Sequence, residues 1–135
     1  MIALYKVPEP DPPGNQAALD PEVSQQLWKI TLHNFSPDDL DFEKDFELVV
    51  LTHRPQFDPE VSPSTALLNF IHPRHAVYLI GPDSRKLESV DIPLMLQNLR
   101  RHNVHIPTDS LHPMWGHVVW SIVYWDRLTK AGLNF

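Results

Sequence analysis

Cysteine is absent from this sequence of 135 residues, and glycine occurs only four times. Without cysteine the chain has no disulfide and no cysteine-ligated zinc site, which suits an intracellular protein, and we expect a cytoplasmic one. No stretch reaches the roughly 18 apolar residues of a membrane span, and residues 1–6 do not have the pattern of a signal peptide. The glycine-rich loops GxxxxGK[ST] and GxGxxG are also missing, so we expect no phosphate cradle of either type.

Basic residues are few as well: 11 Lys and Arg stand against 17 Asp and Glu, a formal net charge of -6. This balance argues against a protein that coats nucleic acid without specificity, because counterion release requires clustered cations. It leaves room for a local basic patch, and the candidates for contacting RNA are Arg85, Lys86, Arg100 and Arg101. Each pair taken alone could equally be solvated surface charge.

The hydrophobic content of 42%, with four Trp, six Phe and three Tyr, predicts a globular protein. A chain of this length is expected to form one domain, residues 1–135, with a core of its own. The sequence contains no internal repeat and no linker that would divide it.

Strand patterns alternate with helix starts along the chain. Short runs rich in β-forming residues predict strands at 2–5, 31–35, 46–52, 76–80 and 104–106. Start signals that contain proline predict helices over 20–30, 62–71 and 91–101, the last ending at Arg100 and Arg101, and a helical turn from Ser36. This alternation predicts an α/β layer structure with a mostly parallel sheet.

Residues 115–128 are apolar on almost every side. Their valine, isoleucine and aromatic residues favour a strand, whereas the length of the segment and the Pro and Gly before it favour a helix. A helix that is apolar all round must be covered on both sides. We therefore expect either a contact with a partner subunit or a central helix in the core of a monomer.

Three predicted strand ends fall next to loops, at 52–54, 81–83 and 106–108. Ligands of open parallel sheets bind beyond the carboxyl ends of the strands, so these three bends could line one pocket. Gly81 would let a ligand approach the backbone closely, although a strand followed by an ordinary turn gives the same pattern.

Histidines suggest a separate hypothesis, a metal centre. Two pairs are spaced three residues apart and two more histidines follow: His72 and His75, His102 and His105, His112 and His117. Imidazole is a good transition-metal ligand, but no carboxylate or cysteine pattern completes a recognised site, so we predict no metal.

Three parts of the chain share motifs with one known family. Residues 77–87 read VYLIGPDSRKL, residues 104–108 read VHIPT before the apolar segment 118–128, and residues 2–15 contain IALY, Pro8-Glu9 and Gly14-Asn15. These resemble the FGPExRGL segment, the IPM loop with a terminal helix that commonly ends like VVYE, and the opening LYxPEIPxNTGN of the SPOUT superfamily of knotted RNA methyltransferases. The segments occur in the family's order, and residues 16–75 match poorly.

The resemblance implies a SPOUT-like α/β knot, with five or six mostly parallel strands flanked by helices and a trefoil knot towards the carboxyl terminus. It also implies that 115–128 is a helix through which two chains form a homodimer, and that the loops at Gly81, Ile106 and Trp115 bind S-adenosylmethionine. Together with the strand ends, the candidate cofactor-binding residues are Thr52, Gly81, Pro82, Ile106, Pro107, Met114 and Trp115. Backbone groups and apolar walls can hold adenosine, so such a site needs no side-chain signature.

The chain departs from the family at positions that the family uses for catalysis. Ribose-methylating members have an arginine shortly after the GN pair, where this chain has Gln16 to Leu19, and the family's Ser and Asn before the terminal helix align with His112 and Met114. The glycine of RGL is replaced by Lys86. Methyl transfer requires the methyl in line with the attacking oxygen and help in removing a proton. His112 and His117 titrate near neutrality, so either is a candidate catalytic base.

Two hypotheses for the function follow. The first is an S-adenosylmethionine-dependent methyltransferase that modifies tRNA or rRNA at a ribose 2′-hydroxyl. The second is a catalytically inactive SPOUT-like homodimer that serves as a binding or structural subunit, and the missing arginine favours it.

Overall fold

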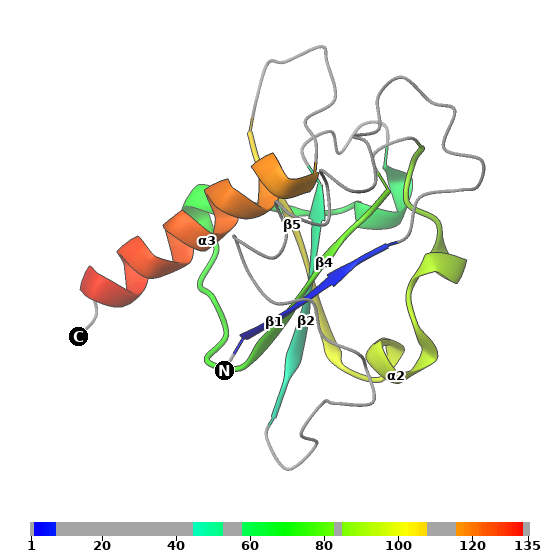
Figure 1. The fold of residues 1–135 in the computed structure, drawn as a ribbon, viewed down its shortest axis with the longest axis horizontal. Coiled ribbons are helices and arrows are strands. Elements are labelled where there is room, and N and C mark those ends of the chain that lie inside the picture. Colours follow the sequence, from blue (N-terminus) through cyan, green and yellow to red (C-terminus); the bar gives the residue numbers. More distant parts are fainter. Residues whose placement is uncertain (1, 8–44, 53–57, 83–84, 108–115, 134–135) are drawn as a thin grey trace.

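A five-stranded parallel sheet forms the centre of the computed structural model, which describes residues 2–7, 45–52, 58–82, 85–107 and 116–133 (Figure 1). Its strands are β1 (Ile2–Lys6), β2 (Glu47–Thr52), β3 (Thr65–Ala66), β4 (Ala76–Ile80) and β5 (Arg100–His105). They lie in the order β1-β4-β2-β5-β3, and every pair is parallel.

Strands β4 and β2 occupy the middle of this sheet. All five residues of β4 are buried, and all of β2 after Glu47 are buried as well. A parallel strand covered on both faces is expected to be a nearly continuous apolar run, and AVYLI and LVVL have that composition. The same β-branched residues that predicted these strands therefore place them at the centre.

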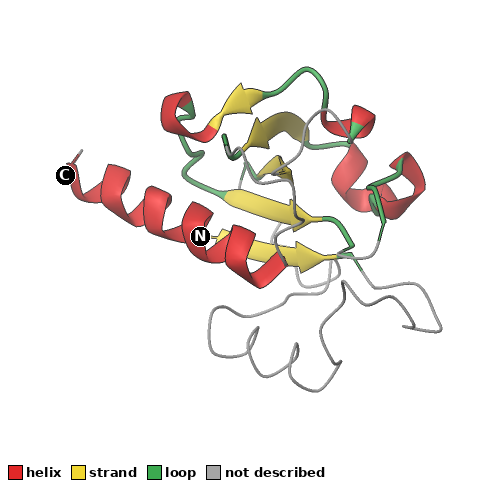
Figure 2. Ribbon diagram, turned by 90° about the horizontal axis from the view of Figure 1, so that it is seen from above, coloured by secondary structure: helices red, strands yellow, loops and turns green. Residues whose placement is uncertain are grey.

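Helical segments cover the two faces of the sheet, as Figure 2 shows. The long helix α3 (Gly116–Leu133) packs on one face through Val119, Trp120 and Val123, which share a core with Val49 and Leu51. The opposite face carries η2 (Pro59–Val61), η4 (Ser89–Asp91) and α2 (Leu94–Gln97). Alternate residues of each strand point to opposite faces, which gives the domain two apolar cores around one sheet.

The structure confirms the α/β class with a parallel sheet flanked by helices, as well as the strands at 2–5, 46–52 and 76–80 within one residue at each end. The terminal segment is a helix, so the choice left open between helix and strand at 115–128 is settled. The predicted helix at 20–30, the strand at 31–35 and the turn from Ser36 lie outside the described residues. No described helix is long and apolar enough to span a membrane.

The predicted helix over 62–71 is wrong. Residues Thr65–Ala66 instead form strand β3, which pairs with Val104 and His105 of β5, and η3 (Leu67–Asn69) is a single 3-10 turn. Leu67 and Phe70 are buried as the helical spacing required, but Ile71 is 86% exposed. Pairing with an open sheet edge satisfies the backbone here, and Pro73 disfavours helical geometry at the residue before it.

The helix predicted over 91–101 is also much shorter than expected. Only Leu94–Gln97 is α-helical, and Arg100 and Arg101 begin strand β5 instead of ending a helix. Strand β5 is hydrogen-bonded to β2 along its whole length, from Glu47–Arg100 to Thr52–His105. Six residues of sheet pairing outweigh the helix propensity of the leucine-rich segment, which moves the strand start four residues before the predicted Val104.

Candidate functional site

The carboxyl ends of β4, β2 and β5 lie side by side. We call this end of the strands the carboxyl edge of the sheet. Leu51 pairs with Ile80 and Thr52 with His105, so the next residues of all three strands meet at this edge. The backbone N–H of Ile106 donates to the carbonyl of Thr52 at 2.9 Å. The described residues at the start of the three predicted bends therefore lie next to each other, whereas residues 53–54, 83 and 108 lie outside the described part of the chain. We call Thr52, Gly81, Pro82, Ile106 and Pro107 the strand-end site.

The chain leaves this edge in two opposite directions. After β2 it reaches η2, whose Val61 belongs to the core on the face away from α3. After β5 it reaches α3, whose Trp120 belongs to the core on the other face. Figure 1 shows the first turn of α3 at the same edge as the end of β2. Adjacent strands that connect to opposite faces make a topological switch point, the place where open parallel sheets bind ligands.

The surface that the strand-end site can offer to a ligand is mainly backbone and apolar side chain. Thr52, Pro82 and Ile106 are buried, Gly81 is half-buried and Pro107 is exposed. The hydroxyl of Thr52 donates to Oδ2 of the buried Asp58 at 2.5 Å. The threonine side chain is therefore engaged inside the protein.

Gly81 has a packing role that the sequence did not reveal. A Cβ atom at this position would lie 3.3 Å from Cβ of Leu87, tighter than ordinary van der Waals contact. The missing side chain therefore makes room for Leu87, and on that side the space expected for a ligand is filled by the chain itself. Substitution by alanine would require Leu87 to shift.

Lys6, which the sequence analysis did not select, brings a positive charge to this edge. Its Nζ donates to the carbonyl of Gly81 at 3.0 Å and to that of Val7 at 3.1 Å. A lysine directly after the apolar run of β1 was the signal that could have identified it. The contact joins the end of β1 to the end of β4.

The remaining catalytic and cofactor candidates are only partly described. His112, Met114 and Trp115 lie outside the described residues. His117 belongs to the first turn of α3.

The four basic candidates lie at two different edges of the sheet. Arg85 and Lys86 follow the carboxyl end of β4, whereas Arg100 and Arg101 open β5 at the opposite edge. The side chains come closer together than these positions in the chain suggest. Arg85 binds Asp91 of η4, and Ser89 and Val90 of η4 line the same pocket as Arg101.

Two of these cations are held by carboxylates. Arg85 binds Asp91 through two contacts of 2.7 Å, and this bond lowers the pKa of Asp91 below its ordinary value. Arg101 donates to Oε1 and to the carbonyl of Glu60. Arg100 is mostly exposed and lies 3.7 Å from Glu47, and Lys86 is exposed.

A second polar cluster lies beneath the carboxyl-terminal half of α3. We call His72, Tyr78, Asp126, Arg127 and Lys130 the helix-docking network. His72 Nε2 lies 2.7 Å from Asp126 Oδ2, and His72 Nδ1 lies 2.7 Å from the hydroxyl of Tyr78. Arg127 donates to that hydroxyl at 3.0 Å, and Lys130 lies 2.8 Å from the same Asp126 oxygen. The signal in the sequence was the charged residues 126, 127 and 130 in a helix that has no other Asp, Glu, Lys or Arg.

Burial decides the protonation of His72. It lowers the pKa of the imidazole below 6.5, aided by the charges of Lys130 and Arg127, while the hydrogen bond to Asp126 opposes this shift. Burial also raises the pKa of Tyr78 to about 12. A neutral His72 that donates from Nε2 to Asp126 and accepts the Tyr78 proton at Nδ1 satisfies every bond, because the phenol oxygen then accepts from Arg127.

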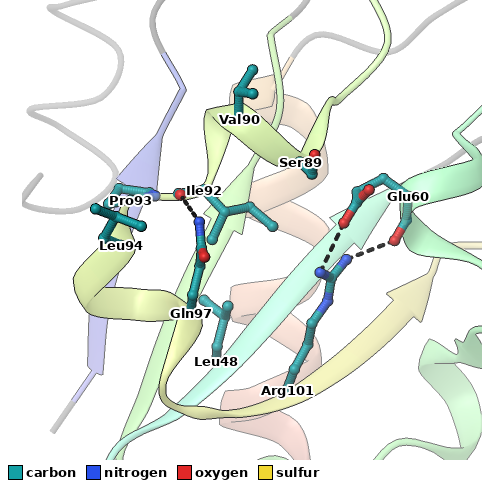
Figure 3. A pocket seen from close by; sticks show the side chains of 9 residues that line it. All are labelled: Leu48, Glu60, Ser89, Val90, Ile92, Pro93, Leu94, Gln97 and Arg101. Carbon is teal, nitrogen blue, oxygen red and sulfur yellow. Dashed lines mark hydrogen bonds and ion pairs between the residues drawn. The ribbon is translucent and has the colours of Figure 1, made fainter.

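The described residues also line two hollows, neither of which is at the strand-end site. One, of about 1110 Å³, lies between the 68–74 segment and α3, bordered by Leu68, Ile71 and Ala131. The other, of about 630 Å³, lies on the opposite face between η4, α2 and β5. Figure 3 shows its Arg101 reaching to Glu60 and its Gln97 bonded to the carbonyl of Ile92. The two charged side chains of this pocket, Arg101 and Glu60, are therefore already paired with each other.

The histidine pairs of the described segments make separate contacts. His102 bonds to Glu47 and His105 to Ser64, while His72 bonds to Asp126. Within the part of the chain that the structure describes, no three histidine, cysteine or acidic side chains come together as metal ligands.

Comparison with protein-family models, with curated proteins and with solved structures finds no match to this chain.

Proposed function

We propose that this protein is an S-adenosylmethionine-dependent RNA methyltransferase of the SPOUT type, acting at a ribose 2′-hydroxyl of tRNA or rRNA. The observation that supports it most is the switch point between β2 and β5, where the chain continues to opposite faces of the sheet from neighbouring strand ends. This is where a nucleoside cofactor is expected in a parallel sheet.

The residues at this edge are compatible with an adenosine moiety. Ile106 and Pro82 supply buried apolar surface, and the carboxylate next to them, that of Asp58, is buried and accepts from Thr52. Apolar walls with a few placed polar groups are typical of small-molecule sites. When bound, the cofactor supplies an electrophilic methyl group. The chain must hold the acceptor hydroxyl in line and remove its proton, and His112 or His117 is proposed as the base.

The proposal extends to the trefoil knot and the homodimer that the resemblance implies. A contact between two copies through α3 is supported by Trp125 and Leu128, which are 66% and 53% exposed one helical turn apart. Large apolar side chains that share one exposed face are typical of interaction surfaces. An enzyme acting on tRNA or rRNA would work in the cytoplasm.

A catalytically inactive homodimer is the second candidate. Two observations favour it: the family's arginine is replaced by the segment Gln16 to Leu19, and Leu87 fills the space beside Gly81. This form would keep the fold and serve as a binding or structural subunit.

Calorimetric titration with S-adenosylmethionine and S-adenosylhomocysteine separates the two candidates. We expect binding of both, and transfer of labelled methyl groups to total RNA. Absence of heat and of a thermal shift with either compound would leave only the inactive subunit. If transfer is found, loss of activity in His112→Ala or in His117→Ala identifies the base, and unchanged activity in both variants removes the histidines from the mechanism.

A further inference from the structure

Asp58 is a buried carboxylate that bonds to two separate connections of the sheet. Its side chain belongs to a residue only 7% exposed, directly before η2. Oδ2 accepts from the Thr52 hydroxyl at 2.5 Å, and Oδ1 accepts from the backbone N–H of Leu87 at 3.3 Å. Thr52 ends β2, and Leu87 belongs to the connection that follows β4.

The bond from Asp58 to Leu87 also fixes the packing next to Gly81. Leu87 is buried and packs against the position where Gly81 has no Cβ, at 3.3 Å. A carboxylate that holds the amide of Leu87 therefore holds the side chain that borders Gly81. In this way one buried group fixes two of the three bends of the strand-end site relative to each other.

The chemistry of Asp58 fits a positioning role better than a catalytic one. A buried carboxylate is costly unless donors satisfy it, and bonds to an ionised acceptor are about twice as strong as neutral ones. Both of its oxygens accept hydrogen bonds from groups of the protein itself. An oxygen engaged in this way is poorly placed to take a proton from a substrate.

We propose that Asp58 is a positioning residue of the strand-end site, holding the end of β2 and the Gly81 bend at the separation that a nucleoside ligand requires. The identity of that ligand rests on the proposed function, whereas the positioning itself is a property of the free protein. A site whose backbone is already in place loses less entropy when the ligand binds.

Two readouts on folded variants test this proposal: hydrogen exchange of the Leu87 amide without ligand, and the affinity for S-adenosylhomocysteine. In Asp58→Ala both anchors are lost, and we expect exchange at Leu87 to be about tenfold faster and binding about tenfold weaker. Asp58→Asn keeps the shape and an oxygen for Leu87, so both effects should be smaller. Unchanged exchange in Asp58→Ala, or faster exchange with unchanged affinity, would overturn the proposal.

Asp91→Asn is the matched control, because Asp91 is a carboxylate of the same connection whose hydrogen bonds come from Glu88 and Arg85. It should leave both readouts near the wild-type values. If Asp58→Ala does not fold, Thr52→Val removes one anchor alone, and a few-fold loss of affinity is expected. Should the wild-type protein bind no S-adenosylhomocysteine, the proposed function fails, and the positioning role is then decided by the exchange of Leu87.

Discussion

His72 shows how a single side chain can make the stability of this protein depend on pH. In the neutral form its ring donates to Asp126 and accepts from Tyr78. A proton added at Nδ1 would turn that acceptor into a donor facing a phenol oxygen that already accepts from Arg127. The Tyr78 hydroxyl would then have to find another acceptor inside the core, where it is fully buried.

We expect this histidine to destabilise the folded protein in acid. Because its pKa is lower in the folded state than the ordinary 6.5, the unfolded chain takes up the proton first. The contribution of the neutral ring is complete above pH 6.5 and is lost as the pH falls from there to the lower folded pKa. Thermal unfolding of the wild type and of His72→Gln at pH 8 and pH 5 measures this contribution to stability.

The wild type should lose more stability between these two pH values than His72→Gln, since the other titrating groups are common to both. An equal loss in the two proteins would show that His72 does not titrate differently on folding.

Among the elements, η3 differs from the helix predicted over 62–71 in a way that substitutions can test. In a helix over 62–71, Leu67 and Ile71 would lie one turn apart on the same buried face. In the structure they have opposite environments, Leu67 being 5% exposed and Ile71 86% exposed. The backbone is extended at Phe70, directly after the 3-10 turn, and this produces the difference.

Alanine substitution at each of these positions tests the turn. Leu67→Ala removes a packed side chain and should lower the free energy of unfolding by about 2–5 kcal/mol. Ile71→Ala should change it by no more than about 0.5 kcal/mol, because that side chain is in solvent. Chemical denaturation gives both values, and similar losses at the two positions would favour the helix that the sequence predicted.

Elements that depend on their own composition were predictable, and elements that depend on distant partners were not. The run AVYLI predicted a buried strand from its own composition, and the register of its neighbours then brought Thr52, Gly81 and Ile106 to one edge. By contrast, Thr65–Ala66 and Arg100–Arg101 are strands because β5 and β2 are beside them, which no local pattern encodes. The bonds of Asp58 and His72 span distant positions and were missed for the same reason.

On the scale of the whole molecule, apolar side chains are exposed on both sides of the sheet. Trp125 and Leu128 project from α3, and Val90 and Leu94 project from the opposite side beside the pocket of Figure 3. The proposed homodimer uses only the first of these surfaces.

Light scattering tests whether the homodimer forms through α3. The wild type should have twice the 15.6 kDa mass of one chain, and Trp125→Glu should shift it towards a single chain, because a charge is costly to bury in an apolar contact. Val90→Glu places the same charge on an exposed apolar residue of the other side and should leave the mass unchanged. A monomeric wild type, or dissociation by Val90→Glu alone, would contradict the α3 contact.

Amide chemical shifts recorded while S-adenosylhomocysteine is added to the labelled protein show directly where a nucleoside binds. We expect the largest changes at Thr52, Gly81 and Ile106, from three strands that are adjacent only in the folded sheet. Shifts confined to the pocket around Leu94 and Gln97, or no shifts at all, would contradict a cofactor site at the carboxyl edge.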